Sequence, residues 1–272
     1  MLKTLREEFP SVLDIAYGEY MHTNHISTIM SAKVKIIEGN RSMLDAASIM
    51  GEYHIGSLLV KGPERPSGIV TERDFITQVI AANKDPKKVK VLDVMTPRLI
   101  TIRPQVTIRE AAKTMIKEKG KLVVVEGRNL VGIVTASDLI KCMPEAPEMS
   151  VPVSKFMTKE VVSTSPNNSV LEVAKMMGKE RIGSVIVNRK NEPWGIFTER
   201  DLLSKVIYKQ EKLEKAIGEF SSSPLITIKP GFSIHKAARV MVEKHVRRLP
   251  VMEDSRLAGI ITARDLVEAY AA

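Results

Sequence analysis

A seven-residue phrase that recurs four times constrains this chain more than any other feature of its sequence. The phrase has the form Gly-x-x-Thr-x-x-Asp, and its copies GIVTERD, GIVTASD, GIFTERD and GIITARD begin at Gly68, Gly132, Gly195 and Gly259. Successive copies are separated by 64, 63 and 64 residues. A fixed period of this length indicates four copies of one supersecondary unit, each covering a neighbour's hydrophobic face.

Each copy of the phrase predicts the end of a strand and the start of a helix. In the first copy Gly68 opens a short apolar strand, Thr71 stops it, and Asp74 precedes an apolar run with helical spacing. Thr71 would then be the N-cap and Asp74 the third helical residue, which together form a capping box. The same geometry also suits a ligand, because helix amides attract anions and a carboxylate accepts hydrogen bonds from two vicinal ribose hydroxyls. The two interpretations are compatible.

Composition excludes several classes of protein. At 272 residues, with 44% apolar and 27% charged residues, the chain resembles a soluble globular protein of one large or two ordinary domains. No stretch approaches 18 apolar residues, and the acids in the first nine residues do not suit a signal peptide, so we expect neither a membrane partner nor export. The single cysteine, Cys142, supports neither an internal disulfide nor structural zinc. Together these features predict a cytoplasmic protein.

The net charge of +9 raises the question of a nucleic-acid partner. The Lys and Arg residues are scattered along predicted helices between Glu residues, which is typical of a solvated surface. Aromatic residues, which stack on bases in single-stranded sites, make up only 4% of the chain. The positive field would equally attract a small polyanionic ligand. Nucleic-acid binding is therefore kept as the less favoured alternative.

Each repeat reads as strand, helix, strand, strand, helix, which predicts an α/β (α+β) fold of small three-stranded sheets with two helices each. The first and third repeats carry TERD, whereas the second and fourth carry TASD and TARD, so a two-repeat unit was itself duplicated. A unit of this size leaves one sheet face uncovered, which favours pairing with its neighbour around a pseudo-twofold axis. The predicted domains are an N-terminal segment (1–25), a first pair (26–143, with repeats 26–91 and 92–143), a proline-rich linker (144–152) and a second pair (153–272, with repeats 153–207 and 217–270).

These features together resemble the cystathionine-beta-synthase (CBS) domain family over residues 26–271. The resemblance rests on the order of elements, the four phrases and the Met-Thr dipeptides at Met95 and Met157. In that family two repeats form a compact module and two modules form a flat disc. The clefts commonly bind AMP, ADP or ATP, and in some members S-adenosylmethionine or dinucleotides. The resemblance therefore implies four-repeat architecture with two modules and an adenine nucleotide as ligand.

Site residues can be transferred from the family motif to this sequence. The resemblance implies ribose contacts from Asp74, Asp138, Asp201 and Asp265, and phosphate or ribose contacts from Thr71, Thr135, Thr198 and Thr262. It implies an adenine edge at Ile55, Gly56 and Ser57 or at Ile182, Gly183 and Ser184, and a basic position at His54, Arg181, Arg247 and Arg248. Arginine pairs favour phosphate, although they also suit the end of a surface helix. The fourth repeat departs from Met-Thr at residues 221–223.

The sequence favours a regulatory protein that binds an adenine nucleotide and passes a signal to a protein partner. It shows no nucleophile beside a base, no zinc spacing and no Walker loop, so we expect no catalytic residue, no metal and no required cofactor. A homodimer is left open. We further expect the cleft that combines Thr198 and Asp201 with Arg247 and Arg248 to bind nucleotide more tightly than its counterpart in the first pair.

Overall fold

A computed structural model describes residues 23–142 and 151–271 of the chain. Their contacts form two compact units. The odd unit contains residues 34–99 and 160–226, and the described part of the even unit contains 23–33, 100–142, 151–159 and 227–271. Each unit thus joins repeats that are not neighbours in sequence. The predicted pairing of neighbouring repeats is a different grouping and stays a prediction; most of the predicted linker and N-terminal segment lies outside the described residues.

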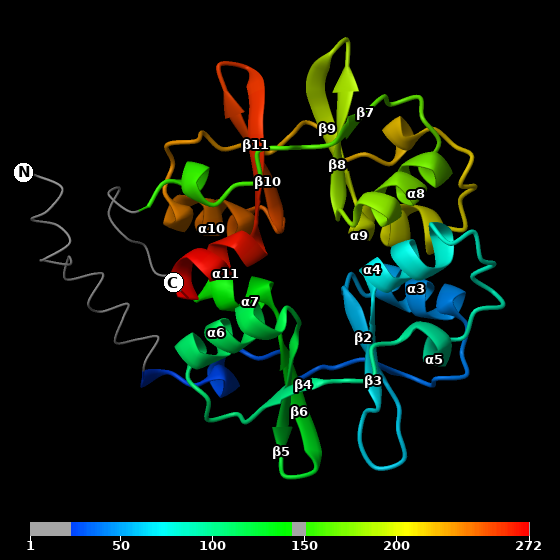
Figure 1. The fold of residues 1–272 in the computed structure, drawn as a ribbon, viewed down its shortest axis with the longest axis vertical. Helices are drawn as coiled ribbons and strands as arrows, with labels where there is room; N and C mark the ends of the chain where they lie inside the picture. Colours follow the sequence, from blue (N-terminus) through cyan, green and yellow to red (C-terminus); the bar gives the residue numbers. More distant parts are fainter. Residues whose placement is uncertain (1–22, 143–150, 272) are drawn as a thin grey trace, which may run out of the picture. The chain divides into compact units, whose positions relative to one another are not determined.

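Helices and strands alternate in both units as the repeat predicts (Figure 1). The odd unit contains β1 (Ile36–Ile37), α3 (Met43–Glu52), β2 (Ser57–Val60), β3 (Gly68–Thr71), α4 (Glu72–Asp74), η2 (Phe75–Ile80), α5 (Val91–Val94), β7 (Ser163–Thr164), α8 (Val170–Glu180), β8 (Ser184–Arg189), β9 (Glu192–Thr198), α9 (Glu199–Asp201), η4 (Leu202–Ile207) and η5 (Ile217–Glu219). The even unit contains η1 (Ile26–Thr28), β4 (Ile100–Ile102), α6 (Ile108–Glu118), β5 (Leu122–Glu126), β6 (Asn129–Val134), α7 (Ala136–Lys141), η3 (Val153–Lys155), α10 (Ile234–Glu243), β10 (Arg248–Glu253), β11 (Arg256–Thr262) and α11 (Ala263–Ala271). In the described ranges no helix has the length and apolar character needed to cross a bilayer.

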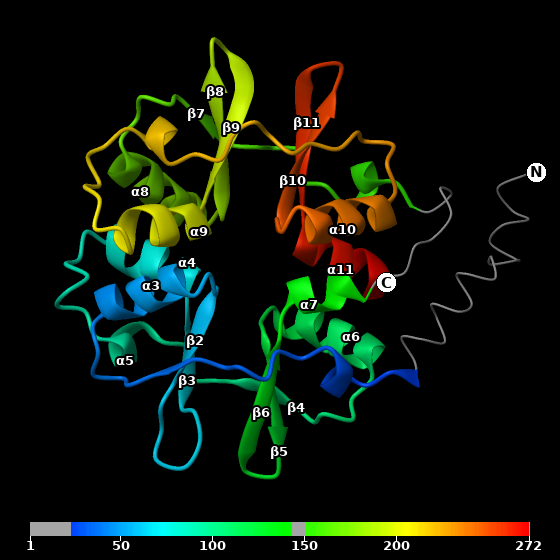
Figure 2. The same ribbon diagram turned by 180° about the vertical axis from the view of Figure 1, so that it is seen from behind.

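Three repeats form the predicted three-stranded sheet, in which the first strand runs parallel to the second and the second antiparallel to the third. The strand orders are β1-β2-β3, β4-β5-β6 and β7-β8-β9, and the sheet hairpins are seen from behind in Figure 2.

The three-stranded prediction was wrong for the fourth repeat. Its sheet has only β10 and β11, with a single parallel bridge between Ile228 and Val251 in place of the first strand. The main-chain N–H of Leu59 in the first repeat donates to the carbonyl oxygen of Lys35, directly before β1, and that of Ile186 in the third repeat donates to Val162, directly before β7. The corresponding residue of the fourth repeat is Pro250, which has no N–H to donate, so the ladder stops after one bridge.

The core of the odd unit is formed by helices of the first repeat packed on helices of the third. Helix α3 lies against η4, and α8 lies against η2, in a reciprocal arrangement. The helices meet closely at Gly51 and Gly178, where neither residue has a side chain to separate them. Phe75 and Phe197 are fully buried in this core. Both η2 and η4 are π-helical turns that directly follow the aspartate of the phrase.

The even unit packs α6, α7, α10 and α11 against one another. Its closing helices, α7 and α11, are α-helical. The odd and even repeats, which the sequence separates by their phrases, therefore also differ in the helix that follows the aspartate.

Candidate functional site

The threonine and aspartate of each phrase form the predicted cap at the start of the closing helix. In all four repeats the main-chain N–H of the threonine donates to Oδ2 of the aspartate at 2.8 to 2.9 Å. The threonine hydroxyl donates to the same oxygen at 2.6 to 2.8 Å. Thr71 is the N-cap and Asp74 the third helical residue, as predicted. The capping interpretation is thus confirmed, and the ligand interpretation depends on what surrounds the other oxygen, Oδ1.

Glycine opens each phrase because another segment of the same unit crosses its backbone. A Cβ at Gly68 would lie 2.7 Å from Sδ of Met95, and one at Gly259 would lie 2.8 Å from Sδ of Met157. The residue after each methionine then pairs with the strand, as Thr96 does with Ile69. The Met-Thr dipeptides that the sequence singled out therefore fix the connecting segments beside the caps of the first and fourth repeats.

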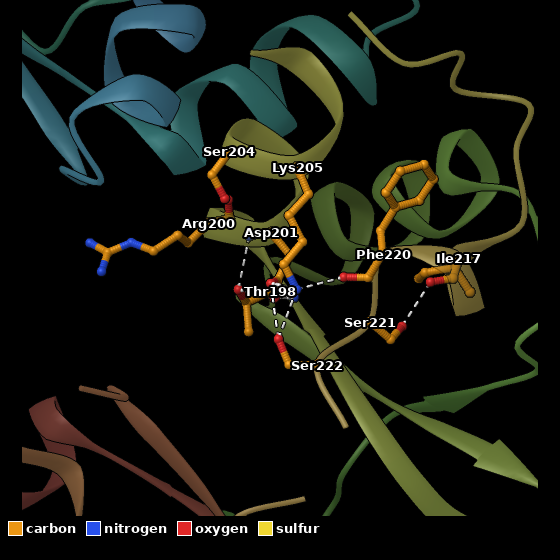
Figure 3. Close-up of polar contacts among 9 residues, drawn as sticks. All are labelled: Thr198, Arg200, Asp201, Ser204, Lys205, Ile217, Phe220, Ser221 and Ser222. Atoms are coloured by element: carbon orange, nitrogen blue, oxygen red, sulfur yellow. Dashed lines mark hydrogen bonds and ion pairs between the residues drawn. The ribbon is translucent and has the colours of Figure 1, made fainter. Parts of the chain in front are cut away.

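Beside the cap of the third repeat, the corresponding segment contains Ser221, Ser222 and Ser223. Ser222 contacts the cap (Figure 3). The Ser222 hydroxyl donates to Oδ1 of Asp201 at 3.2 Å, and the Lys205 ammonium lies 2.7 Å from the same oxygen. Lys205 also donates to the Phe220 carbonyl oxygen and to the Ser222 hydroxyl, both at 2.9 Å. Oδ1 of Asp201 is therefore enclosed by groups of the protein itself.

The other three aspartates have fewer partners at Oδ1. The Gln78 side-chain amide donates to Oδ1 of Asp74 at 3.1 Å, and the Lys141 ammonium lies 3.7 Å from Oδ1 of Asp138. Oδ1 of Asp265 accepts no hydrogen bond from any residue in the described part of the chain. Burial raises the pKa of Asp265, the hydrogen bonds from Thr262 lower it, and Glu268 adds to the increase.

The predicted adenine-edge and basic residues lie beside the threonine of their own repeat. In the antiparallel register Ser57 is opposite Thr71, Ser184 is opposite Thr198, and Arg248 is opposite Thr262. In the first, third and fourth repeats the first helical N–H of the closing helix donates to the residue before these strands, namely to the carbonyl oxygens of Gly56, Gly183 and Arg247.

The remaining predicted residues of the edge form helix ends. The N–H groups of Ile55 and Ile182 donate to the carbonyl oxygens of Met50 and Met177. His54 and Arg181 adopt the left-handed conformation at these ends, with φ of 52° and 54°. The N–H groups of Ile55 and Ile182 are thus used within the protein.

Two letters of the TERD phrase have a role that the sequence analysis missed. Nε of Arg73 lies 3.0 Å from Oε1 of Glu199, and Nε of Arg200 lies 3.6 Å from Oε1 of Glu72, so each repeat of the odd unit pairs with the other. Both glutamates are buried. The signal was present in the sequence, because the even repeats have Ala136 and Ala263 where the odd repeats have these glutamates.

Other kinds of site find little support in the described residues. They contain no group of three or more His, Cys, Asp or Glu side chains that could hold a metal ion. An open groove of about 870 Å³ follows the β8–β9 hairpin of the third repeat, lined by residues 163–167 and 188–194. It does not include Thr198 or Asp201, so it is separate from the cap.

Four copies of one sheet-and-helix unit, each closed by the same threonine–aspartate cap, define a tandem-repeat α/β protein. The chain belongs to the CBS domain family, whose model matches residues 26–81, 91–145, 153–208 and 217–272. The resemblance stated from the sequence is thereby confirmed, and so is the fold class.

Relatives of this chain include two archaeal proteins. Protein MK0525 of Methanopyrus kandleri is 38% identical over 122 residues, which are 44% of this chain and 62% of that protein. Protein MJ1225 of Methanocaldococcus jannaschii is 30% identical over 190 residues, which are 63% of this chain and 68% of that protein. The chain thus spans about two thirds of the length of these relatives.

The crystal structure of MJ1225 has the same fold. It superposes on this chain with a TM-score of 0.75 at 20% identity, covering 91% of this chain and all of that one. MJ1225 is presented there as a proposed archaeal homologue of g-AMPK. At this level of identity the likeness establishes the fold.

Proposed function

We propose that this chain is a regulatory protein that binds an adenine nucleotide at its threonine–aspartate caps and passes the signal to a partner protein. The observation that carries the proposal is the cap of the fourth repeat. There Oδ1 of Asp265 is unpaired within the described ranges, at the start of the nine-residue helix α11, and Arg248 lies opposite Thr262.

These groups match the parts of a nucleotide. An unpaired carboxylate oxygen accepts hydrogen bonds from ribose hydroxyls. A helix N-terminus and arginine side chains attract phosphate through the helix dipole and through charge-assisted hydrogen bonds. Ribose and phosphate are joined in a nucleotide, so one small ligand satisfies both. The description of MJ1225 as a proposed g-AMPK homologue is consistent with this class of ligand.

The capping role supplies a route for a regulatory signal. The aspartate that would hold the ligand also fixes the first turn of the closing helix, and these helices form the cores of both units. A ligand that binds one arrangement of the helices better than another shifts the population toward it. A partner that distinguishes the two arrangements then receives the signal.

A thermal-denaturation panel tests the proposal. The full chain is melted with AMP, ADP, ATP, NAD and S-adenosylmethionine at equal concentrations, and a ligand of the folded state raises the melting temperature by mass action. We expect at least one of AMP, ADP and ATP to raise it. The proposal is wrong if none does so at millimolar concentration. Salt-dependent binding to RNA that survives Asp→Asn changes at all four caps would favour the nucleic-acid alternative.

A further inference from the structure

The four cap aspartates have the same partners at Oδ2 and different partners at Oδ1. An ionised carboxylate offers about four lone-pair positions on its two oxygens. In every repeat the threonine N–H and hydroxyl both donate to Oδ2, so this oxygen is saturated within the protein. A ligand must therefore be held by Oδ1, and the groups around Oδ1 decide whether it can be.

The residue four positions after the aspartate lies about one helical turn further on, from where a side chain can reach Oδ1. It belongs to a π-helical turn in the odd repeats (η2 and η4) and lies in, or directly after, an α-helix in the even repeats (α11 and α7). This residue is different in every repeat, namely Gln78, Cys142, Lys205 and Ala269. Gln78 and Lys205 donate to Oδ1 of their aspartates at 3.1 and 2.7 Å. The thiol of Cys142 donates to the main-chain oxygen of Asp138 instead, and alanine has no donor.

Counting the remaining lone pairs separates the four sites. Oδ1 of Asp201 is saturated by Lys205 and Ser222, and Oδ1 of Asp74 keeps one position beside Gln78. Oδ1 of Asp138 accepts no hydrogen bond from the described residues, although Lys141 partly neutralises it from 3.7 Å. No residue in the described part of the chain donates to Oδ1 of Asp265, so this oxygen keeps both of its lone-pair positions. A vicinal diol has two hydroxyl donors and needs two acceptor positions.

We infer that the residue four positions after each aspartate determines which caps hold a ribose diol, so that Lys205 closes the third site and Ala269 leaves the fourth open. The inference rests on the proposed function and makes it specific. Displacing Lys205 would break its contacts with Asp201, Phe220 and Ser222 together, since its three donors are all used. Arg248, opposite Thr262, adds a phosphate partner at the open site.

This ranking differs from the hypothesis drawn from the sequence. That hypothesis expects the cleft combining Thr198 and Asp201 with Arg247 and Arg248 to bind nucleotide more tightly than its counterpart in the first pair, and it stays a prediction. In the structure Arg248 lies opposite Thr262 in β10, and the Arg247 carbonyl oxygen accepts a hydrogen bond from the Ala263 N–H.

The experiment is isothermal titration of AMP into the full chain and four variants. Asp265→Asn and Asp201→Asn remove the charge of the open and closed sites, and Ala269→Lys installs in the fourth repeat the lysine that closes the third. We expect Asp265→Asn and Ala269→Lys each to weaken AMP binding about tenfold or more, and Asp201→Asn to change it less than about threefold. The fourth variant combines Lys205→Ala with Asp265→Asn and should bind AMP more tightly than Asp265→Asn alone.

A second ligand tests the role of the diol. 2′-Deoxy-AMP lacks one of the two donors and should bind the unaltered chain about tenfold more weakly than AMP. Melting of each variant without ligand shows whether it folds like the unaltered chain.

Three results would overturn the inference while leaving nucleotide binding intact. These are a larger loss from Asp201→Asn than from Asp265→Asn, unchanged affinity in Ala269→Lys, and equal affinity for AMP and 2′-deoxy-AMP. If AMP, ADP and ATP all fail to bind the unaltered chain, the proposed function fails together with the inference.

Discussion

The environment of Asp265 makes the stability of the chain depend on pH in a direction opposite to that of most capping carboxylates. Burial raises its pKa, and the hydrogen bonds from Thr262 only partly offset that effect. A carboxyl group with a higher pKa in the folded chain binds its proton more tightly there, so the free energy of unfolding falls as the pH rises from the unfolded pKa through the folded pKa. The asparagine of the Asp265→Asn variant is neutral at every pH, so its free energy of unfolding does not fall with pH for this reason. We expect its stability relative to the unaltered chain to increase with pH over this interval, as measured by urea unfolding.

Glu172 provides the matched control. It caps α8 from an exposed position, and hydrogen bonds from the main chain and hydroxyl of Ser169 lower its pKa. The stability that it contributes is present above the unfolded pKa and is lost as the pH falls through the folded pKa. Glu172→Gln should therefore become less stable, relative to the unaltered chain, as the pH rises. Equal trends for the two variants would contradict the assignment for Asp265.

Cys142 is the single cysteine of the chain, and its thiol should react slowly. Burial raises its pKa to about 11, and the nearby charge of Asp138 adds to the increase. The thiolate is the reactive form, so alkylation by iodoacetamide at neutral pH should be roughly two orders of magnitude slower than in the urea-unfolded chain. Asp138→Asn should accelerate it. An equal rate in the folded and unfolded chains would show that the thiol is not held in this environment.

At the scale of elements, the two Glu–Arg pairs of the odd unit join α4 to α9. Their strength should come from burial of the glutamates, because Arg73 and Arg200 are partly exposed. A double-mutant cycle with Glu199→Gln and Arg73→Met should give a coupling free energy of about 1 kcal/mol. Glu38 and Lys61 form a shorter contact of 2.6 Å, but both side chains are exposed, so the same cycle there should give a smaller coupling. A larger coupling at the exposed pair would contradict the role of burial.

The sequence predicted those elements whose cause is local. The cap of Thr71 and Asp74 spans four residues, so the spacing alone determines it. The contact between Lys205 and Ser222 joins two repeats across a linker, and no spacing rule predicts such a pairing. The fourth repeat lacks its first strand because the nitrogen of Pro250, which has no hydrogen to donate, stands where the other repeats donate toward that strand. The sequence shows the proline, but only the sheet register shows which way its nitrogen points.

At the scale of the whole molecule, identical phrases are distinguished by what surrounds them. Repetition explains why four caps share one geometry, and it predicts nothing about the residue that follows each aspartate by one turn. Gln, Cys, Lys and Ala differ in helix propensity by less than about 1 kcal/mol, so helix formation alone does not determine this partly exposed position. Similarly, the grouping of odd with odd and even with even repeats depends on helix faces whose partners lie more than 100 residues away in sequence, beyond the reach of local patterns.

Gly51 tests the helix packing that holds the odd unit together. A Cβ there would lie 2.3 Å from the carbonyl oxygen of Leu203, and main-chain atoms cannot rotate away as a side chain does. We expect Gly51→Ala to destabilise the chain by about 1–3 kcal/mol through overpacking, even though alanine favours a helix by about 1 kcal/mol over glycine. Gly231→Ala is the control, because a Cβ there meets nothing within 4 Å; it should leave stability unchanged or raise it slightly. Urea unfolding of both variants measures the difference. If Gly51→Ala proved as stable as Gly231→Ala, α3 and η4 would not be in the close contact that joins the first repeat to the third.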